Sequence, residues 1–181
     1  MPYPNTIGGA LMGYPTTVDN GLVAPLVVFT PGIENSTGTF TVSAGQAYAS
    51  LYTLLASVTL TQMRCCFSGS PTGNIDLGIY DSTGTNGGPG NLQGHTGANA
   101  AATGVFTKSL TANVLLSPGN YWIAFLSTIA NSVFGRQASG AGMIDSVISS
   151  TTGLTVLPSS FGAFTDSNLV TVLCLVSGGF S

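Results

Sequence analysis

The run that most restricts the fold of this chain is NYWIAFLS, at residues 120–127, in which six consecutive residues are apolar or aromatic. Successive side chains of a β-strand point to opposite faces, so a strand with one face in water alternates apolar and polar residues. This run does not alternate, and both of its faces therefore need a cover. The two faces consist of Tyr121, Ile123 and Phe125 on one side, and of Trp122, Ala124 and Leu126 on the other.

In a two-layer sandwich only one of these faces meets the opposite sheet. The other needs a neighbouring subunit, a crossing loop or an N-terminal arm. The run LVTVLCLVS at 169–177 has the same character, and two such strands make a purely local loop a poorer explanation. The sequence therefore favours a closed, symmetric homo-oligomer, a trimer in particular, which would bury the surplus apolar surface. Trp122 is accordingly predicted to be a partner-binding residue.

Charge is scarce along the whole chain. Only 5% of the residues are charged and the net charge is −3, whereas about 25% are charged in typical globular domains. Weak charge repulsion does little to keep copies of a chain apart, which again favours a subunit of an assembly. The three cations, Arg64, Lys108 and Arg136, are dispersed. Nucleic-acid binding needs clustered Lys and Arg, so nucleic acid is not an expected partner.

Targeting signals are missing from the sequence. No apolar stretch reaches the ~20 residues needed to span a bilayer, so no membrane partner is expected. The segment MPYPNTIGGALMGYP lacks the basic region and the continuous apolar core of a signal peptide, which favours synthesis and assembly in a cytosol. The three cysteines, Cys65, Cys66 and Cys174, form no repeating framework. They are predicted to be buried thiols rather than a disulfide scaffold.

Residues 1–24 differ from the rest of the chain. Prolines and glycines recur throughout them, and their apolar residues follow neither period 2 nor period 3.6. This pattern predicts an extended N-terminal arm, followed by one domain over 25–181. A disordered tail would be poorer in apolar side chains, so those of the arm are predicted to bind a partner. They are Tyr3, Ile7, Leu11, Met12 and Tyr14.

From residue 25 onward, short apolar or alternating runs are separated by turns rich in Gly, Pro, Asn and Asp. Strands at this spacing predict an all-β fold, an antiparallel jelly-roll-like β-sandwich, with long loops at 81–91 and 128–150 as Greek-key crossings. The segment 46–56 leaves a short helix open as an alternative. The expected strands are 25–30, 39–43, 55–67, 74–80, 91–96, 105–110, 120–127, 153–157 and 168–177.

The sequence offers little support for catalysis. His95 is the only histidine and could meet Asp76 or Asp81, but a catalytic triad also needs a nucleophile, and no G-x-S-x-G segment is present. The two carboxylates make a poor glycosidase pair, since that chemistry needs both in one cleft and Asp81 begins a turn. The chain is therefore predicted not to be an enzyme and to need no cofactor.

The loop at 81–86 is rich in oxygen-bearing side chains but has a single carboxylate. Calcium takes six to eight oxygen ligands, usually with several carboxylates. Asp81 is therefore predicted to stabilise a turn through an Asx hydrogen bond, and no metal site is expected.

Sugar binding is the most serious chemical alternative, because an exposed aromatic ring with Asp or Asn nearby can hold a saccharide. Trp122 is the only tryptophan, and its apolar run favours burial in a core or an interface. The sequence does not place the tyrosines on one face with it. Those considered are Tyr48, Tyr52, Tyr80 and Tyr121.

Part of the chain resembles a known group of proteins. The segments LGIYD (77–81), PGNL (89–92) and LSPGNYWIAF (116–125) are similar to those of β-sandwich modules in bacteriophage virion proteins. That group includes tail-fibre domains and capsid decoration proteins. The resemblance covers roughly residues 55–127.

The resemblance implies a non-enzymatic structural protein of a bacteriophage virion, assembled in the host cytoplasm. Within that class the sequence favours capsid decoration, or cement, with the N-terminal arm anchoring the chain to the major capsid protein. The alternative is a tail-fibre or receptor-binding module that recognises a host surface glycan. A carbohydrate-binding module detached from an enzyme is an unrelated third hypothesis.

Overall fold

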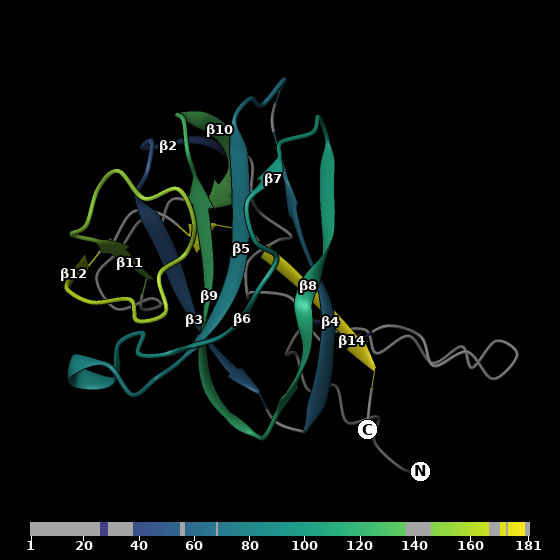
Figure 1. Cartoon of the computed structure of the whole chain (residues 1–181), viewed down its shortest axis with the longest axis vertical. Helices are drawn as coiled ribbons and strands as arrows, with labels where there is room; N and C mark the ends of the chain where they lie inside the picture. The colour runs from purple at the N-terminus through teal and green to yellow at the C-terminus, as the bar shows by residue number, and fades with distance from the viewer. Residues whose placement is uncertain are drawn as a thin grey trace, which may run out of the picture.

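The chain forms an antiparallel β-sandwich in which two sheets pack face to face (Figure 1). The computed structural model describes residues 26–28, 38–54, 57–67, 69–136, 146–166, 171–172 and 174–179. Within these residues the only helical element is a single 3-10 turn, Thr85–Gly87 (η2). The predicted all-β antiparallel sandwich is confirmed.

The first sheet has the strand order β1-β14-β4-β8, and every pairing in it is antiparallel. Its ladder between β4 and β8 is interrupted by a register shift between Leu60 and Gln62. A small separate sheet has the order β13-β10-β2. The strands of these two sheets are β1 (Leu26–Val28), β14 (Cys174–Gly179), β4 (Val58–Cys66), β8 (Val105–Leu116), β13 (Thr171–Val172), β10 (Asn131–Arg136) and β2 (Gly38–Val42).

The second large sheet has the order β12-β11-β3-β9-β5-β6, with β7 paired to β5. Strand β9 lies at its centre, between β3 and β5. The strands of this sheet are β12 (Phe164–Asp166), β11 (Ser146–Ser149), β3 (Ala47–Leu54), β9 (Gly119–Ser127), β5 (Asn74–Asp81), β6 (Leu92–His95) and β7 (Asn99–Ala100).

The chain alternates between the two large sheets. Eight strands of these sheets can be numbered one to eight in chain order, namely β1, β3, β4, β5, β6, β8, β9 and β14. Across the first sheet their order is then 1-8-3-6, and across the second sheet it is 2-7-4-5. This order is compatible with the predicted jelly roll, whose topology stays a prediction here.

The main core lies between the two sheets. Phe67 joins the layers, because its ring packs edge-on against Phe106 at 6.2 Å and tilted against Phe125 at 6.1 Å, between ring centroids. Alternate residues of β5 and β9 point into this core, as period 2 requires, whereas on β4 the alternation changes phase at the register shift, so that Leu60 and Met63 both belong to the core. Its largest buried members include Leu60, Met63, Ile75, Leu77, Ile123 and Phe125.

A second core lies on the outer face of the β9 sheet. The segment 150–163, between β11 and β12, crosses that face (Figure 1, yellow-green) and buries Leu157 and Phe161 against it. The structure therefore has three layers, namely sheet, sheet and covering segment. The members of this second core are Ala47, Ala49, Tyr80, Trp122, Ala124, Leu126, Val147, Leu157 and Phe161.

The two faces of β9 divide between the cores as the alternation predicts. Ile123 and Phe125 belong to the main core, with Tyr121 packed against it, and the alternate residues belong to the second core. Of the three covers that the sequence left open for this face, the crossing loop is the one found, and the favoured neighbouring subunit is not needed for this strand. The chain's own segment covers it, so β9 gives no support for an oligomer.

Backbone hydrogen bonds fix the covering segment at several points. Leu154 N donates to Gly45 O at 3.0 Å, Leu92 N donates to Ser159 O at 2.9 Å, and Phe161 N donates to Gly90 O at 3.0 Å. These bonds satisfy main-chain groups that would otherwise be buried without partners, and they explain how an irregular segment serves as a layer of the fold.

A glycine on β5 makes room for this layer. A Cβ atom at Gly78 would lie 2.6 Å from Leu157 Cδ1, which is well inside van der Waals contact. The absence of a side chain at this position therefore lets Leu157 lie directly on the sheet.

Three local predictions need correction. Within the segment 46–56, residues 47–54 form strand β3 rather than a helix; both faces of this strand are covered, and its sequence consequently lacks alternation. The predicted loop 128–150 contains β10 and β11. The predicted strand 153–157 is irregular, because its apolar residues serve the covering segment rather than a ladder.

The predicted arm, residues 1–24, lies outside the described residues, and so do its predicted partner-binding side chains. The side chains of 169–177, the second doubly apolar run, also lie outside them. The arm and the oligomer therefore stay predictions.

We expect Leu157→Ala to lower the free energy of unfolding by about 2–5 kcal/mol, the usual range for a buried Leu, because it opens a cavity over Gly78. Urea unfolding followed by Trp122 fluorescence measures this change. Val156→Ala is the matched control, since Val156 is 41% exposed, and should stay within about 0.5 kcal/mol of the parent. Equal, small effects of both changes would show that the covering segment is not part of the core.

Candidate functional site

The chain buries one carboxylate under the covering segment. Asp76, on the outer face of β5, is 1% exposed. Its Oδ2 accepts hydrogen bonds from Leu157 N and from His95 Nδ1, both at 2.9 Å. Its Oδ1 accepts from Thr96 Oγ1 at 3.3 Å. A buried carboxylate needs such donors to offset its lost hydration, so Asp76 joins β5, β6 and the covering segment.

Of the two carboxylates that His95 could meet, the structure brings it to Asp76, and the geometry of this pair is that of the orienting half of a catalytic triad. Among the described residues, however, the imidazole hydrogen-bonds to no hydroxyl group. The same Asp76 oxygen also holds a loop amide. Both observations favour a structural role, in which the pair attaches the covering segment to the sheet.

Tyr80 also attaches the covering segment to the sheet. Its hydroxyl donates to Pro158 O at 2.7 Å, and its ring meets Phe161 edge-on, with centroids 5.2 Å apart. Burial, with a smaller contribution from the negative charge of Asp76, raises the pKa of Tyr80 above its usual value. The phenol therefore stays neutral and acts as a fixed donor to the covering segment.

Asp81 organises the turn that follows β5. Its Oδ1 accepts from Thr83 N at 3.1 Å and from Asn91 N at 2.9 Å, and its Oδ2 accepts from Gln93 Nε2 at 3.0 Å. The predicted Asx hydrogen bond is thus confirmed. Since the carboxylate already accepts from these donors, the turn is better explained as a structural element than as an ion site. Among the described residues, no group of three or more His, Cys, Asp or Glu side chains could hold a metal ion.

Two opposing effects act on the pKa of Asp81. Burial raises it, but the hydrogen bonds from Thr83 and Asn91 together outweigh burial and hold the pKa below its usual value. The ionised form is therefore the one that the turn stabilises.

A surface pocket of about 280 Å³ lies beside this turn. One wall is the backbone of the 3-10 turn and the other is the paired strands β11 and β12, in which Val147 and Asp166 are directly opposite. An aromatic floor connects them. The lining residues are Asn86, Gly87, Gly88, Trp122, Val147, Phe164 and Asp166.

Trp122 lies at the inner side of this pocket rather than on an open interface. It is 3% exposed, and its Nε1 donates to Gly87 O at 3.0 Å. Its side chain packs within its own domain, so the partner that was predicted to cover it is replaced by the chain itself. The indole also fixes the 3-10 turn relative to β9.

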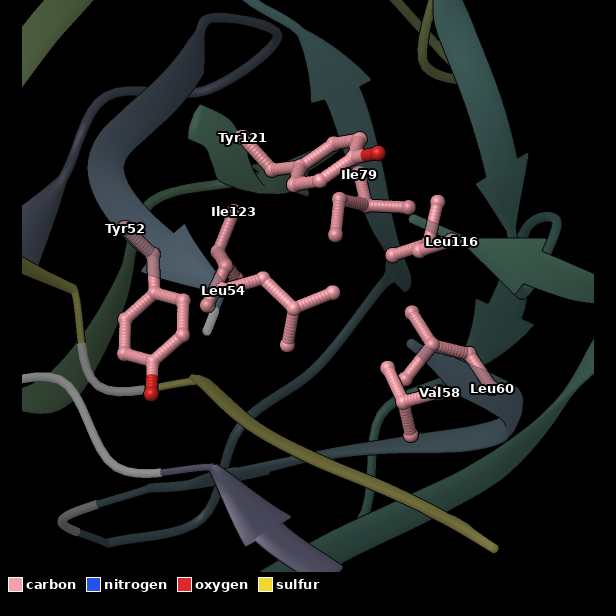
Figure 2. Close-up of a pocket in the computed structure, with 8 residues that line it drawn as sticks. All are labelled: Tyr52, Leu54, Val58, Leu60, Ile79, Leu116, Tyr121 and Ile123. Atoms are coloured by element: carbon pink, nitrogen blue, oxygen red, sulfur yellow. The ribbon is translucent and has the colours of Figure 1, made fainter. Parts of the chain in front are cut away.

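A second, much smaller space lies inside the main core (Figure 2). It measures about 10 Å³, and its lining residues include Leu54, Leu60, Leu116 and Ile123. A space of this size holds about one water molecule, and apart from Tyr52 and Tyr121 its lining side chains are aliphatic and offer that water no hydrogen-bond partner. It is a packing gap of the core rather than a ligand site.

Most residues of the surface pocket were not predicted from the sequence. Trp122 was considered as an aromatic residue for sugar or partner binding, but Asn86, Phe164 and Asp166 were not predicted to be binding residues. These residues come from separate segments and share no spacing. The one local signal is the Asn-Gly-Gly run at 86–88, which is typical of turns that require left-handed backbone.

No helix in the described part of the chain is long and apolar enough to cross a membrane.

Removing the charge of Asp76 should loosen the covering segment. We expect Asp76→Asn to lower the free energy of unfolding by about 1.5–3 kcal/mol, the range for a hydrogen bond to a charged group. Hydrogen exchange should show faster exchange of the Leu157 amide. Asp166→Asn, at an exposed carboxylate on the same sheet, should change neither quantity. An unchanged Leu157 amide in Asp76→Asn would contradict this role.

The turn at Asp81 should make stability depend on pH in acid. Because its pKa is lower in the folded state, its stabilising contribution is complete above the unfolded value, near 3.8, and is lost as the pH falls through the folded value. We expect the stability difference between the parent and Asp81→Asn to shrink from about pH 5 down to about pH 2. Urea unfolding over that range measures it, and a constant difference would refute the assignment.

The comparisons with known proteins add no family to this picture: no protein-family model matches the chain, and no curated protein is similar to it.

Proposed function

We propose that this chain is a non-enzymatic structural protein of a bacteriophage virion. Within that class we favour a capsid decoration protein that forms a homo-oligomer and attaches to the major capsid protein through residues 1–24. The observation that carries the proposal is the scarcity of free charge. Of the six acidic residues, Asp76 is buried and Asp81 is held in its turn by hydrogen bonds. With nine charged residues in the whole sequence, the chain has little charge repulsion to oppose close packing in an assembly.

The strand order gives a second line of support. We interpret the alternation of strands between the two large sheets as two Greek keys, which make a jelly roll. Jelly rolls occur in viral capsid proteins and also in lectins, and a fold does not by itself fix a function. The jelly-roll interpretation therefore supports the proposal but does not carry it.

Two observations support self-association after β9 is set aside. Strand β9 gives no such support, because its outer face is covered by the chain's own segment. The scarcity of charge and the doubly apolar run at 169–177 remain. A trimer stays the proposed state, with the virion as its location after assembly in the host cytoplasm.

Deleting residues 1–24 separates attachment from folding. We expect the shortened chain to keep the cooperative unfolding of the sandwich and to lose attachment to capsids of the encoding phage that were prepared without the protein. Co-sedimentation with those capsids measures attachment, and circular dichroism with urea unfolding measures folding.

Two outcomes would contradict this proposal. Unchanged occupancy of the capsid by the shortened chain would show that the arm is not the anchor. Failure of the full chain to bind capsids, together with binding to host cells, would favour the tail-fibre alternative.

A further inference from the structure

The surface pocket beside the 3-10 turn has the features of a ligand site that the proposed attachment role does not use. Its walls come from the turn, from β9 and from the paired strands β11 and β12. Two of these walls are tied together, since Trp122 Nε1 donates to Gly87 O. The pocket is therefore formed before any ligand arrives, which lowers the entropy lost on binding.

The turn keeps its shape through close backbone packing. A Cβ atom at Gly88 would overlap Phe164 Cζ, so the aromatic ring lies directly on the glycine backbone. Asn86 has φ 55 and ψ 31, and it is the one described residue other than glycine with a positive φ. Asn adopts this conformation more readily than most other residues. Here the conformation holds the Asn86 amide at the rim of the pocket.

The polar groups of the rim are available to a ligand. The Asn86 amide and the Asp166 carboxylate are both exposed, and neither side chain has a hydrogen-bond or ion-pair partner among the described residues. An amide both donates and accepts, and an ionised carboxylate accepts only. Together they match a ligand with several hydroxyl groups.

The charge and the aromatic rings exclude other small ligands. Among the described residues that line the pocket, Asp166 is the only charged one, so it disfavours an anion. A quaternary ammonium ion needs aromatic faces around it, but Trp122 is 3% exposed and presents little of its ring. A neutral ligand with an apolar face for Phe164 and hydroxyls for the rim fits the whole set.

The volume sets the size of this ligand. Pockets for drug-sized molecules begin at about 300 Å³, and this one measures about 280 Å³. One sugar ring is the polyhydroxylated ligand that suits this space.

We propose that this pocket binds a single pyranose unit of a neutral saccharide. Asp166 and Asn86 hydrogen-bond to its hydroxyls, and the Phe164 ring packs against its carbon-hydrogen face. The site goes beyond the proposed attachment function and does not depend on it, since a decoration protein and a tail-fibre module could each carry it.

The chain offers a simple reporter for this proposal. Trp122 is the only tryptophan, so the folded protein gives a single indole N–H peak in a ¹⁵N-correlated NMR spectrum. The full chain is titrated with D-glucose, D-galactose, D-mannose and N-acetyl-D-glucosamine. At least one of them should shift this peak in a saturable way, with a dissociation constant in the millimolar range.

Three variants locate the binding. Asp166→Asn should weaken it at least about tenfold, as expected for losing a hydrogen bond to a charged group. Asn86→Gly, which removes the amide but tolerates the positive φ, should weaken it as well. Asn113→Ala is the control, because Asn113 is an exposed amide on β8, away from the pocket, and should leave the affinity unchanged.

Three results would overturn the proposal: no response to any of the four sugars, equal affinity in Asp166→Asn and the parent, or saturable binding of tetramethylammonium in place of the sugars. The last result would make the pocket a cation site. Because the measurement uses no capsid, its outcome is separate from that of the arm deletion.

Discussion

The contact on which the rest of this structure depends is the packing of Leu157 against the bare backbone of Gly78. It brings an irregular segment onto the outer face of a sheet and turns a two-layer sandwich into three layers. Without it, the apolar side chains on the outer face of β9 would be exposed to water. Their exposure would cost a free energy of about 25 cal/mol for each Å² of apolar surface. The polar groups around Leu157 then orient this layer, with Asp76 accepting from its backbone amide.

The same covering segment also creates the surface pocket. It ends in β12, which pairs with β11 and brings Phe164 and Asp166 beside the 3-10 turn. Trp122 belongs to both features, since its ring lies in the second core and its Nε1 fixes the turn. The core that stabilises the domain and the pocket proposed to bind a sugar therefore share one set of supports, and a change in the packing of the segment would alter both.

The proposed function rests on the scarcity of charge, and the proposed sugar site rests on the pocket. A surface with few charges allows close approach of copies or of a capsid lattice, while a small preformed pocket suits one sugar ring. The buried pair of Asp76 and His95 is explained by the packing of the covering segment. These roles are compatible within one protein, because they use different parts of the chain.

Several features of the protein follow from its sequence alone, because they depend on period 2 and on local turn chemistry. They are the strand class, most strand positions, the opposite facing of alternate β9 residues and the Asx turn at Asp81. The sequence also showed that both faces of β9 must be covered. Only the tertiary structure decided what covers them: residues 150–163 have no periodic pattern, and a glycine that admits Leu157 looks like any other glycine in a strand. The pocket was hidden for the same reason, since Asn86, Trp122 and Asp166 are distant in sequence and meet only when the sheet and its covering segment pack together.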